Sequence, residues 1–219
     1  GFAIAAALQR AGVAPHEVGH VIMGQVLMAG QGQVPSRQAA SKAGIPMSVP
    51  SISINKVCLS GLNSIYLADQ MIQSGEADIV IAGGMESMTN APYLAMGARS
   101  GFRFGDVQLL DAIQRDGLWC AFDACLMGLG TERYAAGDIS RDVQDDLAMK
   151  SNVRAAEAIA AGRLADEIVP ISIPQRKGDP LVIDTDEGVR ASTTMESLGS
   201  LKPAFDKDGT VTAGNASQI

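Results

Sequence analysis

Aromatic residues, cysteines and excess positive charge are all scarce in this 219-residue chain. Phe, Trp and Tyr make up 4% of it, which is few for the aromatic-rich strands of an all-β sandwich. Three cysteines form no even-numbered disulfide framework. The net charge of −7 offers no broad basic surface, so nucleic acid is not expected as a partner. With neither a secretory signal nor a membrane-spanning apolar run in the sequence, we expect no membrane partner and a reducing, cytoplasmic location.

The residues that are abundant favour an α/β fold. Hydrophobic residues make up 47% of the chain, enough for a large core. From residue 1 to residue 84, helical and strand-like segments alternate, and Gly or Pro stands at their ends. Later stretches are irregular apart from one expected helix, which Ser140 would cap. The predicted segments are helices at 2–11, 35–43, 59–74 and 141–161, and strands at 20–26, 51–57 and 77–82.

The helix predicted at 59–74 carries apolar residues at three- and four-residue steps, which mark one face. These residues are Leu62, Ile65, Ala68, Met71 and Ile72. The apolar run 77–82 that follows is typical of a strand covered on both faces. We expect this strand to end at Gly83 and Gly84, at the sheet edge where ligands bind in open α/β folds.

Cys58 stands between the strand predicted at 51–57 and this helix. The start of a helix presents unpaired N–H groups and a partial positive charge, which favour the thiolate form of a cysteine. From position alone the alternative is a small buried hydrophobic residue, which is the usual fate of a free cysteine.

Four runs of the sequence resemble signature motifs of the thiolase family. The run around Cys58 resembles the nucleophile motif, and a run that begins at Gly83 resembles the second signature. The four runs are 55–61 (NKVCLSG), 83–93 (GGMESMTNAPY), 30–40 (GQGQVPSRQAA) and 209–217 (GTVTAGNAS). Their order and spacing also match, and the resemblance covers essentially the whole chain.

The resemblance implies a layered αβαβα thiolase fold, built from two similar halves with a loop domain inserted in the first. Residues 1–88 would then be most of the first half, and residues 89–219 would be the loop domain that covers coenzyme A. It also implies a homodimer or homotetramer, in which the irregular residues 95–118 are a candidate tetramer contact.

The resemblance further implies an acyltransferase that condenses two acetyl-CoA molecules or cleaves 3-ketoacyl-CoA. Cys58 would hold the acyl group, and its backbone N–H would be one oxyanion-hole donor. CoA thioesters would be substrates, with no permanently bound cofactor and no metal. The residues that match CoA contacts in the family are Met127 beside the acyl group, Arg190 and Ser197 near the adenine, and Ala213 and Ser217 along the pantetheine. Many relatives have His where this chain has Leu126.

Other candidate residues are given structural roles. Cys120 and Cys125 have no nearby His or further Cys that would complete a metal site, so we expect inert buried thiols. His16 and His20 are interpreted as surface or turn residues. We expect Glu86 and Asn90 to fix loops through hydrogen bonds. A local basic pocket for CoA phosphates would include at least one of three residues: Arg176, Lys177 and Arg190.

The family's activating His, second Cys and water-binding Asn would lie beyond Ile219, and the start inside a helix also suggests truncation. A ketoacyl synthase on the same fold is a related alternative. A non-catalytic binding module that retains the loop domain is an alternative from another class.

Overall fold

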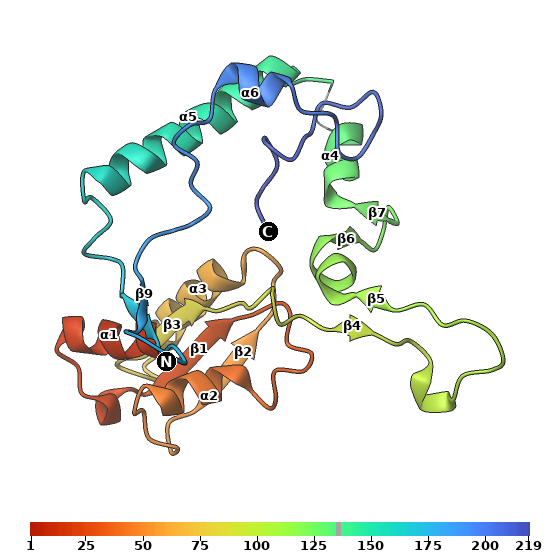
Figure 1. Ribbon diagram of the computed structural model, residues 1–219. Helices are drawn as coiled ribbons and strands as arrows, with labels where there is room; N and C mark the ends of the chain where they lie inside the picture. Colours follow the sequence, from red (N-terminus) through yellow and green to blue (C-terminus); the bar gives the residue numbers. More distant parts are fainter. Residues whose placement is uncertain (135–136) are drawn as a thin grey trace. The chain divides into compact units, whose positions relative to one another are not determined.

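The computed structural model describes residues 1–134 and 137–219, which form two compact units (Figure 1). The first unit is Gly1–Leu118 and the second is Trp119–Ile219. The sequence instead suggested a division near residue 88, and the assignment of residues 89–219 to a CoA-covering domain stays a prediction.

A three-stranded parallel sheet lies at the centre of the first unit. Its strands are β1 (His20–Gly24), β2 (Ser51–Ile54) and β3 (Val80–Gly84), in the order β2-β1-β3. The helices are α1 (Phe2–Ala11), the short 3-10 turn η1 (Pro15–Glu17), α2 (Pro35–Lys42) and α3 (Ser60–Gln73). The alternation predicted for residues 1–84 is therefore confirmed, with strands shorter than expected. Parallel strands joined by helices define the α/β class.

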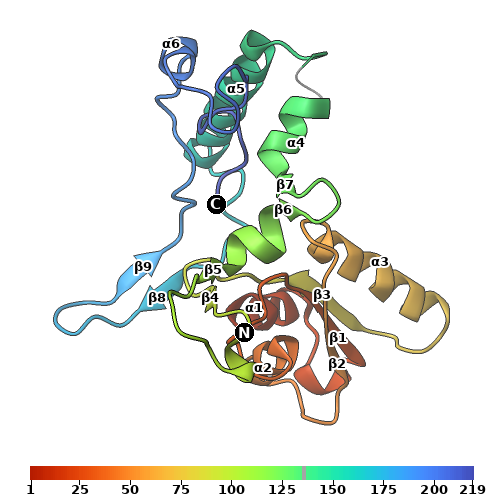
Figure 2. The same cartoon turned by 90° about the vertical axis from the view of Figure 1, so that its right-hand side faces the viewer.

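Helices cover both faces of this sheet, with α1 and α2 on one face and α3 on the other (Figures 1 and 2). Because side chains alternate along a strand, Val21 and Met23 enter the core with Ile4 and Leu8 of α1. The intervening residues of β1 then face α3. Burying each large aliphatic side chain contributes about 1.5–3 kcal/mol, so this core fixes the strand that leads to the site.

The apolar face predicted for α3 is buried only at Ala68. Its buried residues are Ser60, Ser64 and Ala68, which recur every four positions. Leu62 and Ile65 are instead 64% and 55% exposed. Small side chains let a helix approach a sheet closely, and here that close approach overrides the hydrophobic pattern.

The strand predicted at 77–82 is also displaced. Strand β3 spans Val80–Gly84 and thus includes both glycines that were expected to end it. Its first four residues are half-buried rather than fully covered. The unit continues through β4 (Tyr93–Leu94), η2 (Ala98–Ser100), β5 (Leu110–Asp111) and a π-helical turn, η3 (Ile113–Leu118), and β4 pairs antiparallel with β5.

The second unit contains more regular structure than the sequence indicated. The expected long helix is present as α5 (Arg141–Ala160), and Ser140 is its N-cap by position without a side-chain hydrogen bond. Helix α6 (Met195–Gly199) packs beside α5 (Figures 1 and 2). The other elements are β6 (Trp119–Cys120), β7 (Cys125–Leu126), α4 (Met127–Tyr134), β8 (Ile171–Ile173) and β9 (Leu181–Ile183).

Among the helices that the structure describes, none combines the length and the apolar character needed to cross a membrane.

Candidate functional site

Cys58 lies in the short turn between β2 and α3, two residues before the helix begins, and its side chain is exposed. The sequence-based alternative, a cysteine buried in the core, is therefore wrong for the first unit. At the start of α3 the backbone N–H groups have no partner one turn earlier in the helix, and the helix dipole presents its positive end. The thiol is thus accessible at a position that suits a nucleophile.

The residue before Cys58, Val57, has a strained backbone conformation. Val57 has a φ of 49°, in the left-handed region that a β-branched residue rarely adopts. Asn55 Oδ1 accepts the Val57 N–H at 2.9 Å, and the Val57 carbonyl accepts the Ser60 hydroxyl at 2.6 Å. The Ser60 hydroxyl oxygen in turn accepts the Lys56 N–H at 2.8 Å. These bonds stabilise the conformation in which Cys58 projects outward.

Glycines bring the first turn of α3 against the carboxyl ends of two strands. A Cβ added at Gly24 would lie 2.5 Å from the Ser60 carbonyl carbon and 2.7 Å from the Gly61 nitrogen. The Ser64 hydroxyl donates to the Gly83 carbonyl at 2.9 Å, which joins the helix to β3. The position of Cys58 is therefore fixed by backbone packing behind it.

Glu86 anchors the loop after β1. Its carboxylate oxygens accept the N–H groups of Val26 at 2.8 Å and Leu27 at 3.0 Å. Asn90 donates its side-chain amide to the Ser87 hydroxyl at 2.8 Å. The loop-fixing hydrogen bonds predicted for Glu86 and Asn90 are confirmed.

The second unit contains a cavity of about 640 Å³ between α5, α6 and the chain's last segment. Four residues predicted to contact CoA line it: Arg190, Ser197, Ala213 and Ser217. The structure thus brings together four positions that the sequence separates, although their contact with CoA stays a prediction. The Ser197 hydroxyl already donates to the Thr194 carbonyl at 2.8 Å, as part of the N-terminal cap of α6.

Other predicted residues lie elsewhere in the second unit. Met127 is the first residue of α4, is 55% exposed and is not part of the cavity lining. Leu126, where many relatives have His, is half-buried at the end of β7. Arg176 and Lys177 lie in the exposed turn between β8 and β9. Of the three cations proposed for CoA phosphates, Arg190 is the one that lines the cavity.

A polar network that was not predicted from the sequence supports one wall of the cavity. Asp145, which is 2% exposed, accepts Arg141 Nε at 2.7 Å and Asn215 Nδ2 at 2.9 Å. Asn215 Oδ1 then accepts the Thr212 N–H at 2.7 Å. A buried charge needs partners, but Asp145 and Asn215 stand 70 residues apart, so no local pattern in the sequence reveals the pair.

Glu132 supports the same segment from α4. Its carboxylate accepts the N–H groups of Thr210 at 2.8 Å and Val211 at 2.6 Å. Charge-assisted hydrogen bonds of this kind are about twice as strong as neutral ones. Residues 210–215 are therefore held in place from α4 and from α5.

Neither histidine is placed near Cys58. His16 is exposed in η1, and His20 is the half-buried first residue of β1. The end of β1 that lies against α3 is the opposite one, at Gly24. In residues 1–134 and 137–219, no group of three or more His, Cys, Asp or Glu side chains could hold a metal ion.

The first unit has an exposed cysteine at the carboxyl edge of a parallel sheet, and the second has a cavity lined by an arginine and small residues. These features are typical of α/β proteins that use a nucleophile for covalent catalysis. Comparison with known proteins narrows this class. The sequence model of the family described as "Thiolase, N-terminal domain" matches residues 1–219. The chain belongs to the thiolase family, and its predicted α/β thiolase fold is confirmed.

Several relatives carry the same name. The chain is 55% identical over 218 residues to the "Probable acetyl-CoA acetyltransferase" of Mycolicibacterium smegmatis, an alignment that covers 99% of this chain and 56% of the relative. It is 54% identical over 217 residues to the "Acetyl-CoA acetyltransferase" of Cupriavidus necator, with coverages of 99% and 55%. The crystal structure of the Bacillus anthracis acetyl-CoA acetyltransferase matches with a TM-score of 0.94 at 38% identity, covering 99% of this chain and 55% of that one. The chain thus spans about half the length of these relatives.

Proposed function

We propose that the protein transfers acyl groups between coenzyme A thioesters, and that Cys58 carries the acyl group. The observation that carries this proposal is the exposed thiol at the start of α3, held by the strained Val57 turn. The names of the relatives, all acetyl-CoA acetyltransferases, support the same reaction.

In the proposed mechanism the Cys58 sulfur attacks the thioester carbonyl of an acyl-CoA. The carbon–sulfur bond to CoA breaks, CoA leaves as the free thiol, and the acyl group remains on Cys58 as a new thioester. A second acyl-CoA loses an α-proton, and its carbanion attacks the acyl carbon. A carbon–carbon bond forms, the bond from that carbon to the Cys58 sulfur breaks, and 3-ketoacyl-CoA leaves while a proton returns to the sulfur. The reverse sequence cleaves 3-ketoacyl-CoA. The Cys58 backbone N–H, ahead of the first helical turn, would donate to the oxyanion.

The second unit is proposed to hold the substrate's CoA moiety. Its cavity combines the Arg190 cation with small residues, Ala213 and Ser217. A guanidinium suits a phosphate, and small residues leave room for a narrow pantetheine chain. CoA thioesters would therefore be substrates, without a permanently bound cofactor.

The protein is proposed to act in lipid metabolism in the cytoplasm. It is also proposed to form a homodimer or homotetramer. Exposed apolar side chains within residues 95–118 support self-association. They are Met96, Phe102, Phe104, Val107 and Leu109.

An exchange reaction tests the proposed first half-reaction. The full-length protein, given acetyl-CoA and isotopically labelled CoA, should move the label into acetyl-CoA. Cys58→Ser should slow this exchange by about a thousandfold or more, because removing a nucleophile abolishes the covalent route. Cys120→Ser, a matched thiol substitution elsewhere, should keep the wild-type rate. Unchanged exchange in Cys58→Ser would refute the proposal.

A further inference from the structure

Cys120 and Cys125 face one another across a short hairpin. Strand β6 pairs antiparallel with β7, and the register places Cys120 directly opposite Cys125. Opposed residues of such a pair project to the same face, with Cα atoms about 4.5–5.5 Å apart. A disulfide needs a Cα separation of about 4.4–6.8 Å. The backbone of the reduced protein therefore already has the spacing of a disulfide.

The Cys120 thiol is held by Asp123 and remains partly open to solvent. Its side chain is half-buried, and its Sγ donates to Asp123 Oδ2 at 3.3 Å. The Asp123 N–H donates back to the same sulfur at 3.4 Å. The Tyr134 hydroxyl donates to the other carboxylate oxygen of Asp123, Oδ1, at 3.0 Å. This hydrogen bond raises the pKa of Tyr134. Cys120 is thus held in place by Asp123 and is the thiol of the pair that solvent can reach.

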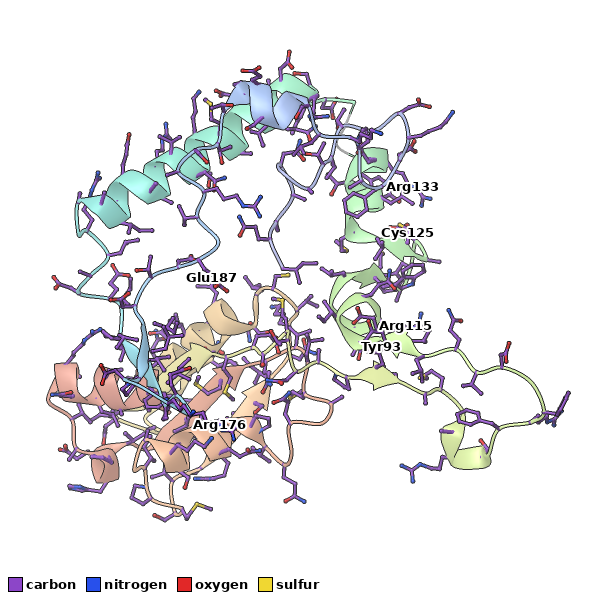
Figure 3. All side chains as sticks on the ribbon, in the orientation of Figure 1. Tyr93, Arg115, Cys125, Arg133, Arg176 and Glu187 are labelled. Carbon is purple, nitrogen blue, oxygen red and sulfur yellow. The ribbon has the colours of Figure 1, made fainter. Side chains whose placement is uncertain are left out.

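The surroundings of Cys125 differ. It is 4% exposed, and Arg133 Nη1 donates to its Sγ at 3.6 Å. Figure 3 labels Cys125 at the hairpin and Arg133 on the helix that follows it. Burial keeps large reagents away from this sulfur. One cysteine of the pair is therefore accessible, and the other can react only with its neighbour. The sequence-based expectation of buried thiols is confirmed for Cys125 and wrong for Cys120, which is half-buried.

We propose that Cys120 and Cys125 form a reversible disulfide with low-molecular-weight disulfides as oxidant. The Cys120 sulfur attacks one sulfur of the disulfide RSSR, a new sulfur–sulfur bond forms as the old one breaks, and the Cys120 proton ends on the released thiolate, which leaves as RSH. Cys125 then attacks the Cys120 sulfur of the mixed disulfide, and a second RSH leaves with the Cys125 proton. Two protein thiols and one RSSR thus give one protein disulfide and two RSH, with two electrons passing to the oxidant.

This site is distinct from Cys58, and its oxidation does not depend on the acyl-transfer proposal. The bridge would close the turn 121–124, in which Ala124 already has a φ of 48°. Since β7 leads directly into Met127, the redox state of the pair would fix the backbone immediately before that residue.

Peptide mapping of the native protein tests this site. Trypsin releases residues 116–133 with both cysteines, whereas Cys58 falls in the separate peptide 57–99. After incubation with glutathione disulfide and alkylation, peptide 116–133 should be lighter than its reduced, unalkylated form by two hydrogen atoms. The amount of peptide with the internal disulfide should exceed the amount with bound glutathione by about tenfold, because the second thiol is already in place. Dithiothreitol should restore alkylation of both cysteines.

Two variants serve as controls. Cys125→Ser should retain glutathione on Cys120, because the resolving thiol is gone. Cys120→Ser should leave the buried Cys125 without glutathione. If peptide 116–133 of the native protein at equilibrium carries glutathione or two alkylated cysteines instead of the internal bridge, the proposal is overturned.

Discussion

Gly24 determines how closely the helix that follows Cys58 can approach the sheet. The space for its missing side chain is occupied by the backbone of Ser60 and Gly61, which cannot move as a flexible side chain could. The strained Val57 and the hydrogen bonds of Ser60 keep the turn in one conformation. The site around Cys58 thus depends on residues that have no chemical role themselves.

Gly24→Ala should therefore displace the start of α3. We expect a loss of about 1–3 kcal/mol in the free energy of unfolding, as for other overpacked positions, together with slower alkylation of Cys58. Urea denaturation and the rate of iodoacetamide reaction measure the two effects. Gly61→Ala is a suitable control, because its added Cβ meets no atom within 4 Å. Equal behaviour of the two variants would contradict this role for Gly24.

Helix α3 shows where prediction from sequence succeeds and where it stops. Its existence and ends follow from the apolar periodicity and from Gly75, so residues 59–74 were predicted closely. Its orientation does not follow, because periodicity identifies an apolar face without showing what covers it. Close contact with glycine-containing strands selected the face of Ser60, Ser64 and Ala68.

Substitutions on the two faces of α3 should separate these alternatives. Ala68→Leu would place a large side chain against the sheet and should cost about 1–3 kcal/mol in unfolding free energy. Leu62→Ala, on the exposed face, should change the stability of residues 1–219 by less than about 0.5 kcal/mol. Urea denaturation of this chain provides the comparison. A larger loss for Leu62→Ala would show that the predicted apolar face is buried after all.

The candidate site as a whole was only partly predictable. Cys58 and Ser217 could be identified because short runs around them resemble family motifs, and Arg190 because its position matches a CoA contact in the family. The Asp145 network could not, because its members come from α5 and from a segment about 70 residues later, and no local pattern links them. Long-range partners of buried charges become visible only when the chain is folded.

Asp145→Ala tests how far the cavity depends on that network. Removing one partner of a buried ion pair typically costs about 3–5 kcal/mol, and Asn215 would lose its anchor, so CoA binding should also weaken. Denaturation and calorimetric titration with CoA measure both effects. Asp146→Ala breaks an exposed pair with Lys150 on the same helix and should cost at most about 1 kcal/mol. Unchanged CoA affinity in Asp145→Ala would show that CoA binding does not depend on this network.

The central claim, that Cys58 accepts the acyl group, is tested most directly by finding where acetyl is attached. The full-length protein is mixed with acetyl-CoA alone, quenched in acid and digested with trypsin. We predict that peptide 57–99 gains one acetyl group, and that neutral hydroxylamine removes it, as expected for a thioester. An acetyl group found on another peptide, or turnover without any acetylated peptide 57–99, would contradict the account.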